Sequence, residues 1–202
     1  MTFSRESPSP RYTELLEQYR AMHKAKQFSG IGAYKHRRAL RRLIRETNAK
    51  VLLDFGCGRG LQFASHNAEA LLSKLNVFCS SWTEALGVER IVGYDPASEA
   101  YSIVPTGKFD GVYAIDVLEH CNETDLPWII EEIFSYAFKF VFLTVAIVPA
   151  KKNLPNGENA HVTLKSQDWW LGLIDEVAKE HPGIRYEVEL EEEVLKSQTD
   201  KE

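Results

Sequence analysis

Several features that would place a protein in a specialised class are missing from this 202-residue sequence. No apolar run approaches the roughly 20 residues needed to cross a membrane, so a membrane-spanning protein is not expected. The polar, Pro/Ser-rich start does not have the pattern of a secretory signal peptide. The three cysteines, Cys57, Cys79 and Cys121, are odd in number and form no C-x-x-C pair, which disfavours a disulfide framework. We therefore expect a cytoplasmic protein with reduced thiols.

The sequence also has no cysteine and histidine cluster at zinc-binding spacing, and we predict no metal site. What is present is the composition of an ordinary globular domain, with 44% hydrophobic and 26% charged residues. Residues 1–50 hold 12 Lys/Arg and 4 Asp/Glu, a balance of +8, whereas residues 51–202 hold 12 and 25, a balance of −13. The basic residues either form a solvated helix face or meet an anionic substrate or partner.

Hydrophobic spacing divides the chain into a helical start and an α/β core. Residues 1–10 are expected to be disordered. Apolar side chains then recur at three- and four-residue spacing, which predicts helices over 11–48 as a cover for the core at 49–190. We treat 11–190 as a single domain, followed by an acidic frayed tail at 191–202.

The most informative stretch is residues 51–60, where a short apolar run ends in an acid and three glycines follow at alternate positions. The run has the length of a buried parallel strand, and the glycines allow a sharp turn with bare backbone facing a ligand. A dinucleotide-binding fingerprint needs its third glycine one residue later, at the position of Leu61, and no P-loop is present. The remaining pattern is D-x-G-x-G-x-G, which begins at Asp54.

This pattern resembles motif I of the class I S-adenosylmethionine (SAM) methyltransferases. The resemblance implies that the ammonium end of SAM lies beside the Asp54 carboxylate, directly or through water. It also assigns the residues of the turn to the cofactor site, namely Gly56, Cys57, Gly58 and Gly60. The alternative is a structural glycine turn between a strand and a helix, with no ligand.

A second acid stands where the resemblance requires a partner for the ribose hydroxyls. The predicted strand at 90–94 ends at Asp95-Pro96, and a carboxylate can accept hydrogen bonds from both hydroxyls of a diol. Only 13 residues separate Asp95 from the apolar run that follows, which is too few for a helix and a full third strand. We expect an abbreviated third-strand region with at most a minimal strand at 101–104. Either backbone groups or residues near Ile115 are expected to contact adenine.

Residues 109–120 carry the second strong resemblance, because they match the F-D-x-V-x-x-x-D-V-L-E-H form of the family's motif IV. The match implies that Asp116 lies beside the cofactor at the carboxyl end of a strand, with Glu119 and His120 at the mouth of the crevice. Together the motifs predict an α/β fold with a doubly wound, mostly parallel sheet, the Rossmann-like fold of SAM methyltransferases. The implied cofactor is SAM, and the implied product is S-adenosylhomocysteine.

In such a reaction the sulfonium already activates the methyl group, so the protein mainly orients the acceptor and excludes water. A base is needed only if the acceptor must lose a proton. We place His161 first, because the long loop that contains it borders the donor in this fold; the other candidates are His120, Glu119 and His23. The side chains predicted to lie near the acceptor are Tyr19, His23, Asn159 and Trp170.

The absence of several motifs narrows the range of possible acceptors. The D/N-P-P-Y/F motif of amino-methylating DNA enzymes, the Pro-Cys nucleophile of cytosine enzymes and the K-D-K-E set of ribose methyltransferases are all absent. We favour methyl transfer to an oxygen or nitrogen of a small polar acceptor that carries a sugar or phosphate. The motifs do not support a nucleic acid as the acceptor. A looser likeness to small bacterial and phage methyltransferases implies no substrate. Two rivals stay open: a non-catalytic SAM-fold subunit and, disfavoured by Leu61, a nicotinamide-dependent oxidoreductase.

Overall fold

The structure is a computed structural model that describes residues 3–28, 31–63, 79 and 81–192. Its helices are α1 (Pro10–Lys24), α2 (Arg37–Thr47), α4 (Trp82–Leu86), α5 (Leu126–Tyr136) and α6 (Gln167–Ala178). Its strands are β1 (Val51–Phe55), β2 (Arg90–Tyr94), β3 (Phe109–Ile115), β4 (Ala137–Ala146) and β5 (Arg185–Glu191). Short 3-10 helices are η1 (Gly32–Tyr34), η2 (Leu61–Phe63) and η3 (Leu118–His120).

Within the described residues the strands form one five-stranded sheet in the order β2-β1-β3-β4-β5, and every neighbouring pair is parallel. This confirms the predicted α/β fold with a mostly parallel sheet. β1 lies between β2 and β3, so the chain builds the sheet outward in two directions from this strand. In open α/β sheets ligands bind at the carboxyl ends of the strands beside such a switch point.

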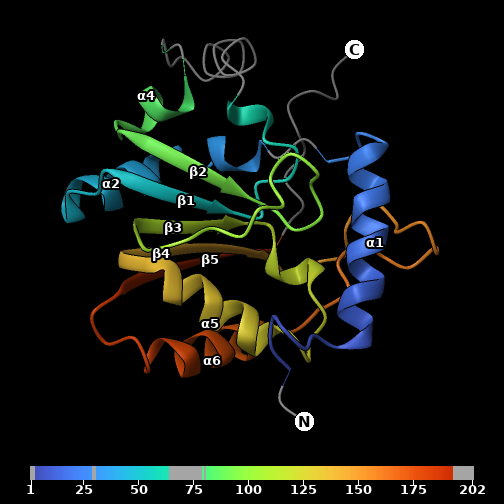
Figure 1. Cartoon of the computed structure of the whole chain (residues 1–202). Helices are drawn as coiled ribbons and strands as arrows, with labels where there is room; N and C mark the ends of the chain where they lie inside the picture. The colour runs from blue at the N-terminus through green and yellow to red at the C-terminus, as the bar shows by residue number, and fades with distance from the viewer. Residues whose placement is uncertain (1–2, 29–30, 64–78, 80, 193–202) are drawn as a thin grey trace.

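The strands are rich in apolar residues because both faces of the sheet are covered. On one face, Ile130 of α5 and Ile174 of α6 belong to a buried cluster with Leu53, Val112 and Val141 of the sheet. Figure 1 shows α5 and α6 together along this side of the sheet, away from α4. The two helices thus form one complete outer layer.

The opposite face is covered by α2 and α4. Leu40 of α2 and Trp82 of α4 share a second buried cluster with Leu52, Tyr113 and Phe142. Consecutive residues of β1, Leu52 and Leu53, therefore enter opposite layers, as the two-residue period of a strand requires. The result is three layers, with the sheet in the middle.

Helix α1 crosses the end of the sheet toward which the strand arrows point (Figure 1). Its inner face buries Leu15 and Met22 against Leu154 and Ala160, which belong to the long loop between β4 and α6. Of the helices predicted over 11–48, α1 therefore lies over the carboxyl ends of the strands, whereas α2 packs on a face of the sheet. Helix α1 closes the side of the domain where a ligand is expected.

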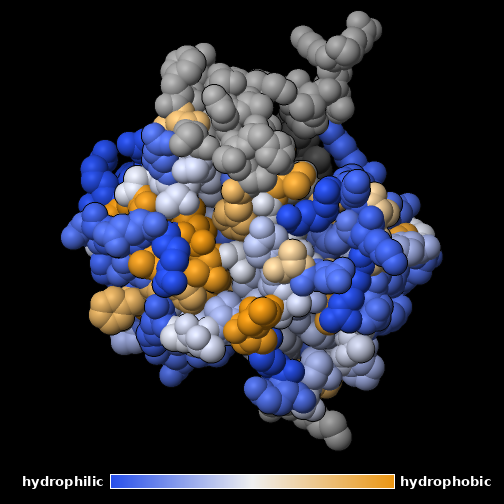
Figure 2. Space-filling view, turned by 45° about the horizontal axis from the view of Figure 1, so that its top comes forward, coloured by the Kyte–Doolittle hydropathy of each residue, from blue (hydrophilic) through white to orange (hydrophobic). Residues whose placement is uncertain are grey.

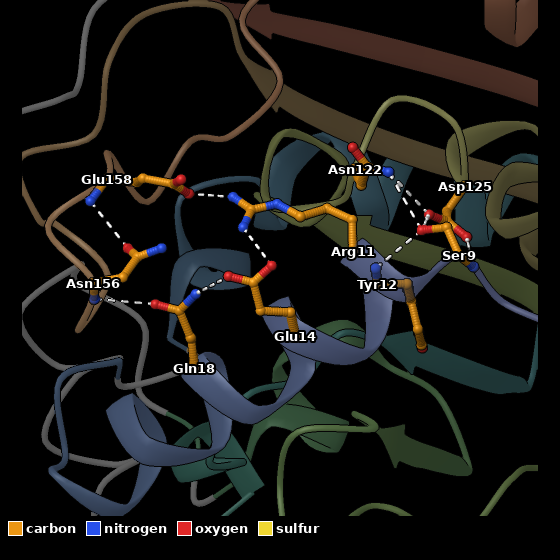
Figure 3. A network of polar contacts seen from close by, with 9 residues as sticks. All are labelled: Ser9, Arg11, Tyr12, Glu14, Gln18, Asn122, Asp125, Asn156 and Glu158. Carbon is orange, nitrogen blue, oxygen red and sulfur yellow. Dashed lines mark hydrogen bonds and ion pairs between the residues drawn. The ribbon is translucent and has the colours of Figure 1, made fainter.

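Polar contacts fix α1 in this position (Figure 3). The Ser9 hydroxyl caps the helix by accepting a hydrogen bond from the backbone nitrogen of Tyr12 at 3.0 Å. The backbone nitrogen of Ser9 donates to the buried Asp125 carboxylate at 3.0 Å, and Arg11 forms an ion pair with Glu158 on the loop after β4. The helix is thereby tied to both segments that flank the cavity described below.

Two expectations for local structure were wrong. Residues 3–9 are not disordered, because Arg5 forms an ion pair with Glu132 of α5 and donates a hydrogen bond to the Tyr94 hydroxyl at 2.8 Å. Residues 101–104 form turn and bend instead of a minimal strand. The abbreviated third-strand region is otherwise as predicted. The expected tail beyond residue 192 and most of the helix expected after residue 63 lie outside the described residues.

The surface mixes hydrophobic and hydrophilic residues. Figure 2 shows hydrophobic patches set among a mostly hydrophilic surface on the face in view. Across the described residues, the large apolar side chains that are well exposed are Ile103, Val104, Phe138 and Leu164. No helix among the described residues is both long enough and apolar enough to cross a membrane.

Candidate active site

A cavity of about 890 Å³ lies at the carboxyl ends of the strands, and α1 forms one of its walls. This volume is within the range of about 300–1,000 Å³ that is typical of small-molecule sites. The three acids predicted for the cofactor site, Asp54, Asp95 and Asp116, all line it. It is also lined by the predicted residues Gly56, Cys57, Gly58, Pro96, Ile115, Tyr19, His23, Glu119, His120 and His161.

The turn after β1 requires glycine for geometric reasons. Gly56, Gly58 and Gly60 have left-handed backbones with φ angles of 80°, 60° and 62°. A Cβ atom on Gly56 would also lie 2.3 Å from the Val117 side chain. Gly60 does not line the cavity as predicted, because its α-carbon faces the ring of Tyr101, 2.3 Å from where a Cβ atom would stand. Packing against Tyr101 accounts for the third glycine.

The Asp95 carboxylate is held by backbone groups at the edge of the cavity. One oxygen accepts a hydrogen bond from the nitrogen of Gly58 at 2.9 Å, and the other accepts from the nitrogen of Ala97 at 2.8 Å. Burial raises the pKa of Asp95, while the nearby His23 ring, at 3.8 Å, acts in the opposite direction. The carboxylate is therefore oriented before a ligand arrives, with further acceptor capacity directed to the cavity side.

Asp54 is buried at the end of β1 and is held by two side chains that the sequence did not identify. Its Oδ2 atom accepts a hydrogen bond from the Gln62 amide at 2.7 Å and a second one from the Tyr113 hydroxyl at 2.9 Å. Burial raises the pKa of Asp54 to about 7, although these hydrogen bonds oppose the shift and Asp95 adds to it. The carboxyl group consequently takes up and releases protons near neutral pH.

Asp116 has a strained backbone at the end of β3. Its φ angle is 54°, which is uncommon for a residue other than glycine and is often found at functional sites. The Thr144 hydroxyl of β4 accepts from the Asp116 nitrogen at 3.0 Å and donates to its carboxylate at 2.8 Å. Burial, followed by the negative charge of Glu191, raises the pKa of Asp116. Thr144 thus stabilises a conformation that turns this acid into the cavity.

The candidate bases lie together at one end of the cavity. The rings of His120 and His161 are 4.9 Å apart and nearly perpendicular. The Tyr19 hydroxyl donates to the Ala160 carbonyl at 2.7 Å and lies 3.2 Å from Nδ1 of His120. Burial lowers the pKa of His120 to about 3, with a further contribution from His161, and burial raises the pKa of Glu119 well above its usual range. His120 is therefore uncharged at neutral pH, and burial disfavours the charged form of Glu119.

Two residues predicted to lie near the acceptor lie elsewhere. Trp170 is fully buried in the cluster that α5 and α6 form with the sheet, and it does not line the cavity. It takes the core position that was expected for Trp169, which is only half-buried. The hydrophobic pattern predicts burial of Trp169, Leu173, Ile174 and Val177 in this helix, whereas the buried residues of α6 are Trp170, Ile174 and Ala178. Asn159 accepts hydrogen bonds from the nitrogens of Ala150 and His161, at 2.9 and 3.0 Å. It shapes the loop that carries His161 instead of facing the cavity.

Four further residues that line the cavity were not identified from the sequence. They are Arg5, Tyr12, Trp128 and Glu132, and they come from the N-terminal segment, α1 and α5. No motif marks these positions, because they meet only when α1 is laid across the sheet. The arginines of α2 do not line the cavity; Arg42, for example, pairs with an acid on β5.

A comparison with protein families decides the class of the domain. A family model described as a methyltransferase domain matches residues 29–182, which is 154 of the 202 residues. The chain belongs to this methyltransferase family. The match includes the glycine turn, the acid after β2 and the acidic segment after β3. The methyltransferase domain also has the fold that the likeness to class I SAM-dependent enzymes implied. No curated protein matches the chain.

Proposed function

We propose that this methyltransferase domain uses SAM and transfers its methyl group to an oxygen or nitrogen atom of a small polar acceptor. The observation that carries the proposal is that Asp54 and Asp95 line one cavity, joined by the glycine turn. SAM would lie across the ends of β1 and β2, with its ammonium group near Asp54 and its ribose on Asp95. A diol suits a carboxylate that is already oriented by backbone donors.

The acceptor would occupy the end of the cavity formed by α1 and by the loop after β4. Tyr19, Phe28 and His120 bring their rings together there, with centroids 5.3–6.3 Å apart. Three lysines, Lys35, Lys151 and Lys152, also line the cavity and would favour an acceptor that carries a phosphate. These lysines support a small phosphorylated or sugar-containing acceptor. The arginines of α2 do not, because they do not line the cavity. Cys57, Cys79 and Cys121 are free thiols, which fits a cytoplasmic setting.

Isothermal titration with S-adenosylhomocysteine tests the cofactor, and NAD serves as the comparison. We expect saturable binding of one S-adenosylhomocysteine molecule per chain and none of NAD. At 100 times the dissociation constant, the ligand should raise the melting temperature by about 5–10 °C. Binding of NAD alone, or of neither ligand, would contradict the proposal.

Turnover distinguishes an enzyme from a non-catalytic subunit of the same fold. Release of S-adenosylhomocysteine from SAM should depend on an added acceptor from a panel of sugar, nucleotide and phosphorylated alcohols and amines. His161→Ala should keep the binding of S-adenosylhomocysteine and lose most of this turnover. Tight binding with no turnover on any acceptor would favour the subunit instead.

A further inference from the structure

Glu119, His120 and His161 form a cluster that the methyl-transfer chemistry alone does not explain. Glu119 and His120 lie on η3 after β3, whereas His161 lies on the long loop after β4. Each side chain offers one metal-ligating atom, and these atoms all lie within 4.8 Å of one another. All three residues line the cavity. The sequence predicted no metal site here because 41 positions separate His120 from His161.

The hydrogen bonds of the two histidines determine which nitrogen of each ring is available. Nδ1 of His120 lies 2.7 Å from the Ala160 carbonyl oxygen, and Nδ1 of His161 lies 2.6 Å from the Val148 carbonyl oxygen. A carbonyl oxygen can only accept, so both Nδ1 atoms carry the hydrogen. Both Nε2 atoms therefore keep a lone pair. Metal-binding histidines typically donate their other nitrogen to a backbone carbonyl in this way.

Glu119 supplies the independent observation. The side chain is fully buried, and its Oε1 atom accepts a hydrogen bond from the backbone nitrogen of Ala146 at 3.0 Å. Its Oε2 atom is buried and finds no hydrogen-bond partner in the described part of the chain. A buried polar atom without a partner is costly, and a bound cation would remove that cost. The Glu119 carboxylate that carries this oxygen belongs to the same cluster as the two rings.

We propose that Glu119, His120 and His161 bind a divalent transition-metal cation of borderline softness, such as Zn²⁺, Co²⁺ or Fe²⁺. Two imidazoles and one carboxylate are the ligand types that these ions prefer, whereas Ca²⁺ and Mg²⁺ prefer oxygen alone. Ligands about 2.1 Å from an ion stand roughly 3.0–3.4 Å apart, so small side-chain rotations would close the cluster around it. Three protein ligands leave at least one coordination position open to the cavity.

The open position gives the site a role in methyl transfer, and this part rests on the proposed function. An acceptor hydroxyl bound to the cation would lose its proton to water more readily. The oxygen would then form a bond to the methyl carbon as the sulfur–methyl bond breaks, which leaves neutral S-adenosylhomocysteine. The acceptor class would be an alcohol or phenol.

Titration of chelator-treated, untagged protein with CoCl₂ tests the site without SAM. We expect one Co²⁺ per chain, with visible absorption typical of imidazole ligation. His161→Gln and Glu119→Gln should each weaken binding by at least about tenfold. His181→Gln is the matched control, since His181 pairs with Glu131 at 2.9 Å on the surface, and it should bind Co²⁺ like the unmodified chain.

Circular dichroism establishes that each variant is folded. If a ligand variant fails to fold, Tyr19→Phe is used in its place. This variant removes the hydroxyl that lies 3.2 Å from Nδ1 of His120 and leaves all three ligands in place. It should weaken Co²⁺ binding measurably. Absence of saturable binding, or binding unchanged in both Gln variants, would overturn the metal site. If the protein binds Co²⁺ but does not bind S-adenosylhomocysteine, only the proposed function is contradicted. If it binds S-adenosylhomocysteine but not Co²⁺, only the metal site is contradicted.

Discussion

The nitrogen of Gly58 donates a hydrogen bond to the Asp95 carboxylate across 2.9 Å, which joins the turn after β1 to the end of β2. The two motifs are 37 residues apart in the chain, yet each fixes the other in the cavity. The donor is a backbone group, and glycine at position 58 has no side chain, which leaves room for a ligand beside this hydrogen bond. The geometry of the site is therefore set before any ligand binds.

Replacing Asp95 should separate cofactor affinity from stability. Asp95→Asn keeps the size of the side chain but loses a charged acceptor, and we expect binding of S-adenosylhomocysteine to weaken by about tenfold or more. The control is Asp110→Asn, because Asp110 also accepts from backbone nitrogens, at 2.7 and 3.1 Å, but lies at the opposite end of the sheet. Calorimetry should find equal affinities for the control and the unmodified chain. Equal affinity in Asp95→Asn would remove this acid from the cofactor site.

Gly56→Ala should damage both stability and binding. Its φ of +80° is unfavourable for alanine by about 1–2 kcal/mol, and the new methyl group would overlap Val117. Gly87→Ala isolates the first effect, since Gly87 has a φ of +76° and nothing within 4 Å of the added carbon. In urea unfolding, Gly56→Ala should lose more free energy of unfolding than Gly87→Ala. It alone should lose affinity for S-adenosylhomocysteine.

Gly172→Ala should make the protein more stable. This glycine lies within α6, and an added Cβ atom would meet nothing within 4 Å. Alanine restricts the unfolded chain and favours the helix, so we expect a gain of roughly 0.5–1 kcal/mol. Scanning calorimetry should show a melting temperature higher by about 1–4 °C. A lower melting temperature would mean that the outer face of α6 is packed against something.

The raised pKa of Asp54 predicts how ligand binding and the stability of the fold depend on pH. Its pKa in the folded chain is raised to about 7, so the protonated form stabilises the ligand-free fold at low pH. This contribution is complete below the unfolded pKa of about 3.9 and is lost as the pH rises through about 7. A cationic ligand favours the ionised form, so the affinity for SAM should rise over the same interval as a proton is released.

Calorimetry in buffers of different ionisation enthalpy measures that proton. Near pH 6.5 we expect a fraction of one proton to leave on binding of SAM, and Asp54→Asn should abolish the release. Proton uptake, or no change in any buffer, would contradict the placement of the ammonium group at Asp54.

The motifs were predictable because each is a local pattern with a local cause. An apolar run that ends in Asp54 and a glycine turn specifies a buried strand and a left-handed turn wherever it occurs. The same holds for the strand that leads to Asp95 and for the segment from Phe109 to His120. Local patterns failed where side chains of one helix compete for burial, as when Trp170 rather than Trp169 entered the core.

The amino-acid sequence alone thus determined the fold class, the order of the acids and the position of the cavity at the strand ends. Only the tertiary structure decided what those acids contact. Gln62 and Tyr113 hold Asp54, and the loop after β4 brings His161 to His120. The contacts of Tyr113 with Asp54 and of His161 with His120 join residues far apart in the chain, and their distances depend on how the sheet and the loop pack together. No spacing within one segment encodes that packing.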